Sequence, residues 1–174
     1  ERLGIAREVA AWLDGRGLVL VAGPSGSGKT TTLSALVRTL GEQRKRVVTF
    51  EDPIEIMHVT SPWVSQRALR VHVPSLAAGV QAAMQEGVDA IVVGAIDSTE
   101  AAAAVIHAVA AGHLVLATIA MGVARGASDR LVDLLPSDRR QSALAALDHA
   151  LLGTIAPVVK GGARSFEVVA GRSG

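Results

Sequence analysis

Residues 17–32 constrain the fold of this chain more than any other stretch. They read GLVLVAGPSGSGKTTT, in which an apolar segment at 18–22 leads into a glycine-rich turn, and a helical pattern begins at Thr30. The turn matches G-x-x-x-x-G-K-[S/T] at Gly23, Gly28, Lys29 and Thr30. A buried strand that feeds a helix through such a turn is typical of an α/β protein with a parallel sheet.

The residue types in this turn suit a phosphate group. Glycine at 23, 26 and 28 allows backbone angles that a Cβ blocks, so that successive N–H groups can face one anion. The helix start adds unpaired N–H groups and a partial positive charge, Lys29 can reach the β- and γ-phosphates, and the Thr30 hydroxyl can ligate Mg²⁺. The alternative is a glycine-rich connection that binds nothing. We predict that ATP or ADP binds here with Mg²⁺, through Gly23, Ser25, Gly26, Ser27, Gly28, Lys29, Thr30 and Thr31.

The composition excludes several classes of function. The 174 residues suffice for one well-buried domain, and the absence of cysteine excludes disulfides and thiolate metal sites. A formal charge of +1 and a total of four aromatic residues argue against nucleic-acid binding. Residues 101–124 are apolar enough for a membrane span, but Gly112-His113 divides them into a helical half and a β-branched half. We expect a cytoplasmic protein, not an integral membrane protein.

The rest of the chain alternates between helical and strand-like patterns. Strands are expected at 18–22, 47–50, 68–73, 90–94, 114–118 and 166–169. Helices are expected at 5–13, 30–40, after Pro74-Ser75, at 98–110, at 128–135 and from 138 onward. The first should bury Ile5, Val9, Trp12 and Leu13 on one face, and the last should bury Leu144, Leu147, Leu151 and Leu152. Gly41 is the expected stop of the helix at 30–40. This alternation predicts a mostly parallel sheet with helices on both faces.

Three carboxylates follow the expected strand at 47–50, namely Glu51, Asp52 and Glu55. In open α/β sheets the carboxyl ends of the strands line the ligand crevice, so these side chains could join the phosphate site. Asp52-Pro53 could instead start an ordinary turn. Further along, Asp97 and Glu100 have the spacing of a helix-capping pair.

Four stretches together resemble the type IV pilus and type II secretion ATPases, with the pilus retraction ATPases as the nearest subgroup. Residues 23–32 resemble the family's Walker A sequence GPTGSGKTTT. Residues 49–58, TFEDPIEIMH, resemble its aspartate box, 89–94 resemble its Walker B strand, and 112–118 resemble its histidine box. Ser65-Gln66-Arg67 and residues 129–136 also fit the retraction subgroup.

The resemblance implies a RecA-like P-loop NTPase fold over residues 1–174, as a single nucleotide-binding domain. It implies ATP-driven pilus extension or retraction (twitching motility), a homo-hexamer or a mixed ring, and inner-membrane platform proteins as partners. The expected location is cytoplasmic and peripheral to the inner membrane. The family places a smaller PAS-like domain before this one, and we expect that domain to be absent here.

The chain departs from the family at the residues expected to take part in ATP hydrolysis. The family's Walker B motif continues Gly-Glu-x-Arg-Asp, whereas residues 94–98 read GAIDS, so Ala95 stands in place of the glutamate. The histidine box should continue Leu-His-Thr-Asn, and Ala120 stands in place of that histidine. In the helix before Walker B, Gln81 and Gln85 stand where the family has two arginines.

Few carboxylates can replace the missing glutamate. Asp89 lies at the wrong end of its strand, about 15 Å away at roughly 3.3 Å per residue. Asp97 is expected to cap the next helix, with a water-mediated role as the alternative. Glu51 and Glu55 remain as catalytic candidates at the neighbouring strand end. The family's aspartate box is implicated in metal and water handling, so the resemblance makes Glu51 the candidate general base and, through water, a candidate Mg²⁺ ligand beside Thr30. His113 is a candidate phosphate sensor, and His58 is a weaker one. For each histidine the alternative is a purely structural role.

Three functional hypotheses remain open at this stage. The chain is a motor ATPase that hydrolyses slowly through Glu51, a nucleotide-binding pseudo-ATPase, or a P-loop small-molecule kinase. A kinase needs an arginine-bearing lid, and no arginine-rich candidate is present. We expect nucleotide binding to be retained and hydrolysis to be weak or lost.

Overall fold

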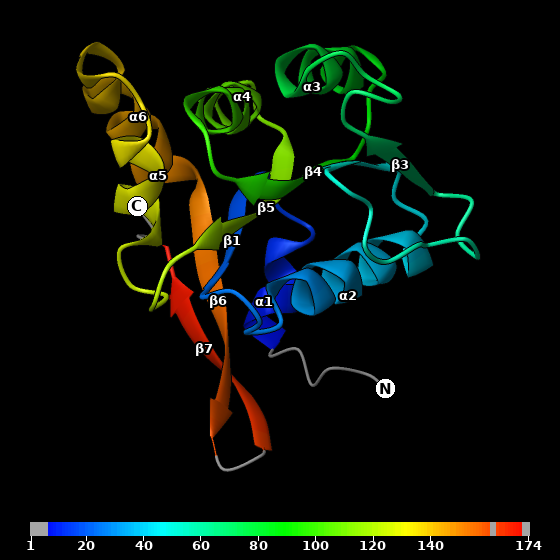
Figure 1. Cartoon of the computed structure of the whole chain (residues 1–174), viewed down its shortest axis with the longest axis horizontal. Coiled ribbons are helices and arrows are strands. Elements are labelled where there is room, and N and C mark those ends of the chain that lie inside the picture. Colours follow the sequence, from blue (N-terminus) through cyan, green and yellow to red (C-terminus); the bar gives the residue numbers. More distant parts are fainter. Residues whose placement is uncertain (1–6, 161–162, 172–174) are drawn as a thin grey trace.

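The computed structural model describes residues 7–160 and 163–171 (Figure 1). In chain order the elements are α1 (Arg7–Trp12), β1 (Gly17–Gly23), α2 (Lys29–Glu42), β2 (Val47–Glu51), β3 (Val64–Ala68), α3 (Leu76–Gln85), β4 (Ala90–Ile96), α4 (Thr99–Ala110), β5 (Leu114–Ala120), α5 (Ala127–Asp133), α6 (Ser137–Ala150), β6 (Leu151–Lys160) and β7 (Ala163–Ala170). Ile5, expected on the first helix, lies outside the described residues.

The described strands form one sheet in the order β3-β2-β4-β5-β1-β6-β7. Every neighbouring pair is parallel except β6 and β7, which are antiparallel. Strand β1 pairs with β5 from Gly17↔Leu114 to Gly23↔Ala120, so the two strands end together. The α/β fold with a mostly parallel sheet is therefore confirmed. The carboxyl ends of β1, β2, β4 and β5 meet at one edge of the sheet, which is where the site lies.

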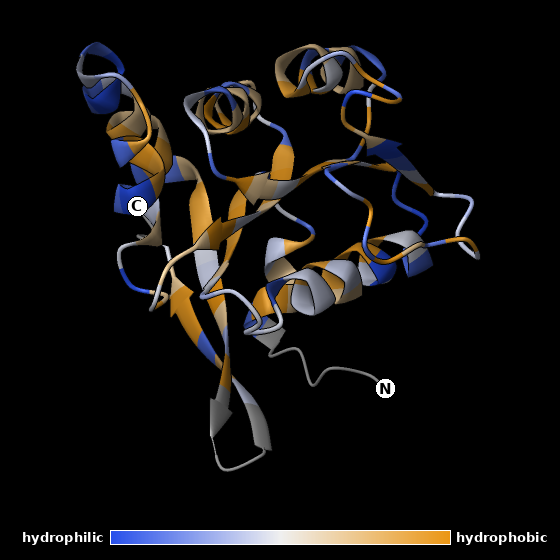
Figure 2. Ribbon diagram, in the orientation of Figure 1, coloured by the Kyte–Doolittle hydropathy of each residue, from blue (hydrophilic) through white to orange (hydrophobic). Residues whose placement is uncertain are grey.

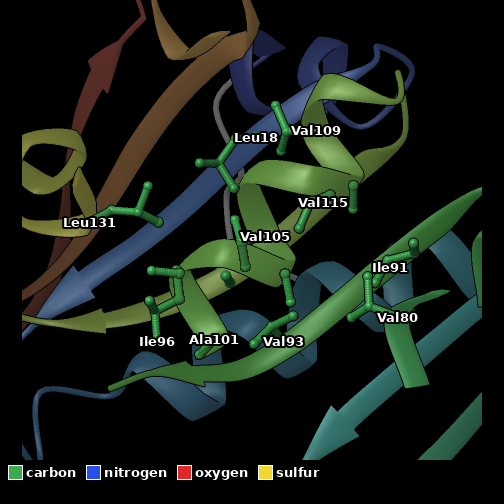
Figure 3. Close-up of a cluster of buried hydrophobic side chains, with 14 of the residues drawn as sticks. Leu18, Val80, Ile91, Val93, Ile96, Ala101, Val105, Val109, Val115 and Leu131 are labelled. Carbon is green, nitrogen blue, oxygen red and sulfur yellow. The ribbon is translucent and has the colours of Figure 1, made fainter. Parts of the chain in front are cut away.

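Helices cover both faces of this sheet. Helices α1 and α2 lie on one face, while α3, α4 and α6 lie on the other, with α5 next to α6 (Figure 1). Apolar residues concentrate along the central strands and on the helix faces that meet them (Figure 2). The larger core cluster joins sheet residues to α4 (Figure 3), and its members include Leu18, Val93, Val115, Ala101, Val105 and Val109.

Helix α2 does not stop at Gly41 as predicted. It continues to Glu42, and Gly41 is a buried helical residue. A Cβ at this position would lie 2.6 Å from Ser61 Oγ and 3.2 Å from a Val64 methyl carbon. Glycine is needed here because another segment crosses the helix closely, and not because the chain reverses.

The strand expected at 68–73 begins earlier, at Val64, and ends at Ala68. It pairs in parallel with β2 along its whole length, from Val47↔Val64 to Glu51↔Ala68. Beyond it, Leu69 and Val73 form only an isolated bridge. The shift matters for the site because it pairs Gln66 with Thr49 of β2, two residues before Glu51.

The apolar residues expected on the last helix divide between two elements. Leu147 is buried on α6, but Leu144 is 43% exposed. Leu151 and Leu152 begin β6, a strand that the sequence did not predict. The predicted strand at 166–169 lies within β7 and pairs with it.

No helix within residues 7–160 and 163–171 is both long and apolar enough to cross a bilayer.

Candidate functional site

The glycine-rich turn between β1 and α2 has the backbone of a phosphate cradle. Gly26 and Gly28 adopt φ angles of 76° and 99°, a left-handed conformation that L side chains rarely tolerate. Gly23 ends β1 and has an ordinary backbone, so its role differs from the predicted one. A Cβ at Gly23 would overlap Ser27 Oγ, which folds back over it. Glycine at 23 therefore provides space, and glycine at 26 and 28 provides the turn.

Two features of this loop fit an anion. Ser27 Oγ is buried, and it has no hydrogen-bond partner among the described residues. Gly28 occupies the N-cap of α2 in a left-handed conformation, and no side chain caps the helix. The first N–H groups of α2 thus lack a side-chain acceptor, and a buried hydroxyl beside them lacks a partner. A phosphate group satisfies both requirements.

Lys29 and Thr30 open α2 next to the cradle. Lys29 Nζ donates to the Pro24 carbonyl oxygen at 2.8 Å, so the side chain folds back across the loop. Burial lowers the pKa of Lys29, and the Glu55 carboxylate partly offsets this by raising it. Thr30 lines a neighbouring cavity of about 380 Å³. The predicted Mg²⁺ ligand therefore faces open space rather than the protein core.

This cavity is acidic and lies at the carboxyl ends of β2 and β4. The carboxylates that line it belong to Glu51, Asp52, Glu55, Asp97 and Glu100. An ion pair between Asp52 and Arg70 offsets one of these charges. Within the described chain, no group of three or more carboxylate, histidine or cysteine side chains could hold a metal ion. A Mg²⁺ ion held by Thr30, nucleotide phosphates and water needs no such group.

Glu51 accepts two side-chain hydrogen bonds at the edge of the cavity. Its Oε1 accepts from Thr49 Oγ1 at 2.6 Å and from Gln66 Nε2 at 3.1 Å. Its Cγ lies against Gly94 of β4, where a Cβ would approach to 3.2 Å. Ala95, the next residue along β4, is exposed and lines the same cavity. Glu51 thus lies beside the end of β4, where Ala95 stands in place of the Walker B glutamate of the pilus and secretion ATPases that the sequence resembles.

The prediction that Asp97 caps α4 is wrong. Ser98 is the N-cap, and its side chain accepts from the Ala101 N–H at 3.2 Å. Glu100, the other half of the expected capping pair, accepts from the Ala77 N–H of α3 at 3.1 Å. Asp97 is left exposed on the cavity wall. Serine takes the cap because the helix begins at Thr99, one residue later than expected, and residue 98 therefore occupies the N-cap position.

His113 does not reach the phosphate loop of its own chain, so the predicted sensing role is wrong for that loop. The residue precedes β5, and its carbonyl oxygen accepts from the Gly17 N–H at the opposite end of β1 from the loop. Six strand residues of about 3.3 Å each separate the two ends, roughly 20 Å in all. The β5 residue that does lie beside the loop is Ala120, paired with Gly23. Asp89, excluded by the same reasoning, indeed lies at the amino end of β4.

A polar network around His58 joins α2 to Glu51, and sequence reasoning missed it. Ser34 Oγ and His58 Nε2 share a hydrogen bond of 3.2 Å, and the His58 N–H donates to Gln66 Oε1 at 2.8 Å. Burial lowers the pKa of His58, Glu51 raises it, and Arg38 lowers it further. The likeness at residues 49–58 covered Glu51 and His58, and the Ser65-Gln66-Arg67 likeness covered Gln66, but neither gave a role for the glutamine.

Comparison with known families identifies the chain. The family model described as Type II/IV secretion system protein matches residues 6–157. The chain belongs to this family.

Curated relatives of this secretion-family chain include proteins of both pilus and secretion systems. It is 37% identical over 142 residues to the Twitching motility protein of Neisseria gonorrhoeae, and the match covers 80% of this chain and 38% of that protein. It is 34% identical over 142 residues to the type IV pilus retraction ATPase PilT of Pseudomonas aeruginosa, covering 80% and 41%. It is 38% identical over 146 residues to the Type II secretion system protein E of the same organism, covering 83% and 29%. The chain thus spans less than half the length of these relatives.

Solved structures of secretion and pilus ATPases share the fold of this family member. The pilus retraction motor PilT with bound ADP superposes with a TM-score of 0.84 at 29% identity, covering 97% of this chain and 52% of that chain. The ATPase DotB of Legionella pneumophila gives a TM-score of 0.82 at 24% identity, covering 95% and 48%. At that identity the DotB match shows the fold alone.

Proposed function

We propose that this chain is the nucleotide-binding domain of a type IV pilus or type II secretion motor ATPase, and that it binds ATP and ADP with Mg²⁺. The observation that carries the proposal is the cradle formed by the turn at Gly26 and Gly28, the start of α2 without a side-chain cap, and the buried Ser27 hydroxyl, which has no hydrogen-bond partner among the described residues. The similar structure of PilT contains ADP, which supports the same ligand class here.

The predicted binding residues differ in their roles in this proposal. The backbone N–H groups of the loop and of the first turn of α2 hold the phosphates, with Ser25, Gly26, Gly28 and Thr31 contributing through the main chain. Lys29 exchanges its contact with the Pro24 carbonyl oxygen for the β- and γ-phosphates. The Thr30 hydroxyl, and Glu51 through a water, would help to hold Mg²⁺ beside the phosphates.

Hydrolysis is proposed to be weak. A positioned acid–base group contributes roughly 10²–10⁴-fold, or about 3–5 kcal/mol of barrier, and the side chain at 95 is a methyl group. Glu51 is the carboxylate that best replaces it, because it lies against Gly94 and shares the cavity with Thr30. A second candidate function is a pseudo-ATPase that binds nucleotide as a regulator. The alanines at 95 and 120, both at the nucleotide end of the sheet, favour it.

The wider assembly follows by analogy with the family. We propose that the domain works in a homo-hexamer or a mixed ring, on the cytoplasmic side of the inner membrane, against platform proteins of a pilus or secretion system. The similarity to proteins of twitching motility and of type II secretion supports this setting.

The test separates binding from turnover. Calorimetric titration with ADP and Mg²⁺ is expected to show binding by the parent and a loss of at least about tenfold in Lys29→Ala, since a charge-assisted contact is worth about 1.5–3 kcal/mol. Phosphate release is measured on both proteins, with Ser65→Ala as a matched surface control because Ser65 is exposed on β3, away from the loop. A parent that binds neither ATP nor ADP overturns the proposal. Turnover of the parent equal to that of Lys29→Ala, with binding intact, selects the pseudo-ATPase.

A further inference from the structure

Gln66 of β3 uses both ends of its side-chain amide to connect Glu51 with the segment that follows it. Its Nε2 donates to Glu51 Oε1 at 3.1 Å and to the Ile56 carbonyl oxygen at 2.9 Å. Its Oε1 accepts from the His58 N–H at 2.8 Å. The amide is therefore fixed by the backbone at 56–58 on one side and is directed at the carboxylate on the other.

Thr49 reinforces the same end of Glu51. Its hydroxyl donates to Oε1 at 2.6 Å, from a side chain that is almost fully buried. Both donors thus hold one carboxylate oxygen, and Oε2 has no hydrogen-bond partner within residues 7–160 and 163–171. Two bonds to one oxygen restrict rotation of the carboxylate about its terminal bond, which leaves Oε2 as the oxygen available to the cavity.

The network also reaches the helix that begins at the phosphate loop. His58, whose backbone Gln66 holds, shares a hydrogen bond with Ser34 of α2. Ser34 lies four residues after Thr30, so the two occupy the same face of α2. Gln66 therefore ties Glu51 to the helix that presents Thr30, and the spacing between the two functional groups is held by side-chain bonds as well as by the sheet.

We propose that Gln66 is a positioning residue for nucleotide hydrolysis, which together with Thr49 orients Glu51 so that Oε2 receives the proton of the attacking water. In that step the water oxygen forms a bond to the γ-phosphorus, and the bond from this phosphorus to the ADP oxygen breaks. One water proton passes to Glu51 Oε2, and ADP and inorganic phosphate are released. This inference rests on the proposed function, because it requires nucleotide at the loop.

The experiment compares two variants that share only one effect. Gln66→Ala removes a donor to Glu51 Oε1 and also the contacts to residues 56–58, whereas Thr49→Val removes the other donor and does not touch that segment. Each is made in the parent and in Glu51→Gln, with Ser65→Ala as the control on the same strand. ADP affinity, thermal unfolding and phosphate release above the Lys29→Ala blank are measured on all of them.

We expect both variants to slow phosphate release by about tenfold, within the range that misplacing a catalytic group produces. ADP affinity should stay within about twofold, because neither side chain touches the loop. In the Glu51→Gln background neither change should slow release further. An effect of Gln66→Ala without one of Thr49→Val, or effects that add to that of Glu51→Gln, would show that Gln66 only braces the segment, and would overturn the proposal. Parent release equal to the blank, with ADP still bound, also overturns it while leaving the proposed nucleotide binding intact.

Discussion

Replacing Ser27 by alanine should change stability and nucleotide affinity in opposite directions. The hydroxyl is buried without a partner among the described residues, and such a group costs the folded state about 1–3 kcal/mol. Ser27→Ala should therefore raise the free energy of unfolding of the nucleotide-free protein by about 1 kcal/mol. If the hydroxyl donates to a phosphate oxygen when nucleotide binds, its loss removes a charge-assisted bond and weakens ADP affinity by about tenfold or more.

These two effects should nearly cancel when nucleotide is present. At an ADP concentration of about 100 times the parent Kd, binding stabilises the parent by about 2.7 kcal/mol. At the same concentration a tenfold weaker variant gains about 1.4 kcal/mol, to which its own increase of about 1 kcal/mol is added. The variant should thus unfold at higher denaturant than the parent without ADP, and at almost the same denaturant with ADP.

Urea denaturation with and without ADP and Mg²⁺ measures both quantities, and calorimetric titration gives the affinities independently. Ser65→Ala, which also removes a serine hydroxyl but from an exposed position, should change neither. A Ser27→Ala variant that is more stable and binds ADP as tightly as the parent would refute the assignment of this hydroxyl to the phosphate site. A destabilised variant would refute the reasoning that the hydroxyl lacks a partner.

Three further predictions concern the same edge of the sheet. Gly23→Ala should lower the free energy of unfolding by about 1–3 kcal/mol and weaken ADP binding, because the new methyl overlaps Ser27 Oγ. Adding Ser27→Gly should recover part of both losses, and a denaturation curve without recovery would contradict this contact. Ala95→Glu alone should raise phosphate release by less than about tenfold, since Ala120 beside the loop is also changed; an increase of about 10² or more would show that position 95 alone decides turnover. Because burial lowers the pKa of His58 in the folded protein, protonation of this side chain favours the unfolded chain. The free energy of unfolding should therefore fall as pH drops below about 6.5, and it should fall less in His58→Asn. A midpoint of the His58 NMR titration at or above about 6.5 would contradict this.

The sequence was sufficient where one local signal fixes the structure. The left-handed turn after β1 is predictable because the φ angles of Gly26 and Gly28 exclude most other residues. Strands β4 and β5 are predictable because they are mostly apolar runs. Strand β6 was missed because Leu144, Leu147 and Leu151 continue a helical spacing without a break. Leu151 leaves the helix because it pairs with Leu18 of β1, and this long-range contact is not visible in a local pattern.

The site was predictable in part, for reasons of strand direction and pairing. Residues that precede a parallel strand lie at the opposite edge from residues that follow one, so the sequence already contained the reason why His113 is remote from the loop. The role of Gln66 was different. Its contact with Glu51 depends on the register Thr49↔Gln66 between β2 and an edge strand without clear alternation of apolar residues, and only the folded sheet sets that register.

In the proposed function, nucleotide binding and hydrolysis depend on different parts of the molecule, and the end of β4 gives the reason why one can be lost without the other. The β4–β5 register is interrupted between Val93 and Ile96, and the Thr118 hydroxyl donates to the Gly94 carbonyl oxygen at 2.5 Å at this break. The backbone that presents residue 95 to the cavity is thus built by neighbouring strands, whatever side chain stands there. The phosphate cradle likewise depends on glycine angles and main-chain N–H groups. Replacing a glutamate by alanine removes a proton acceptor without disturbing either framework, so the proposed loss of turnover is compatible with the proposed nucleotide binding.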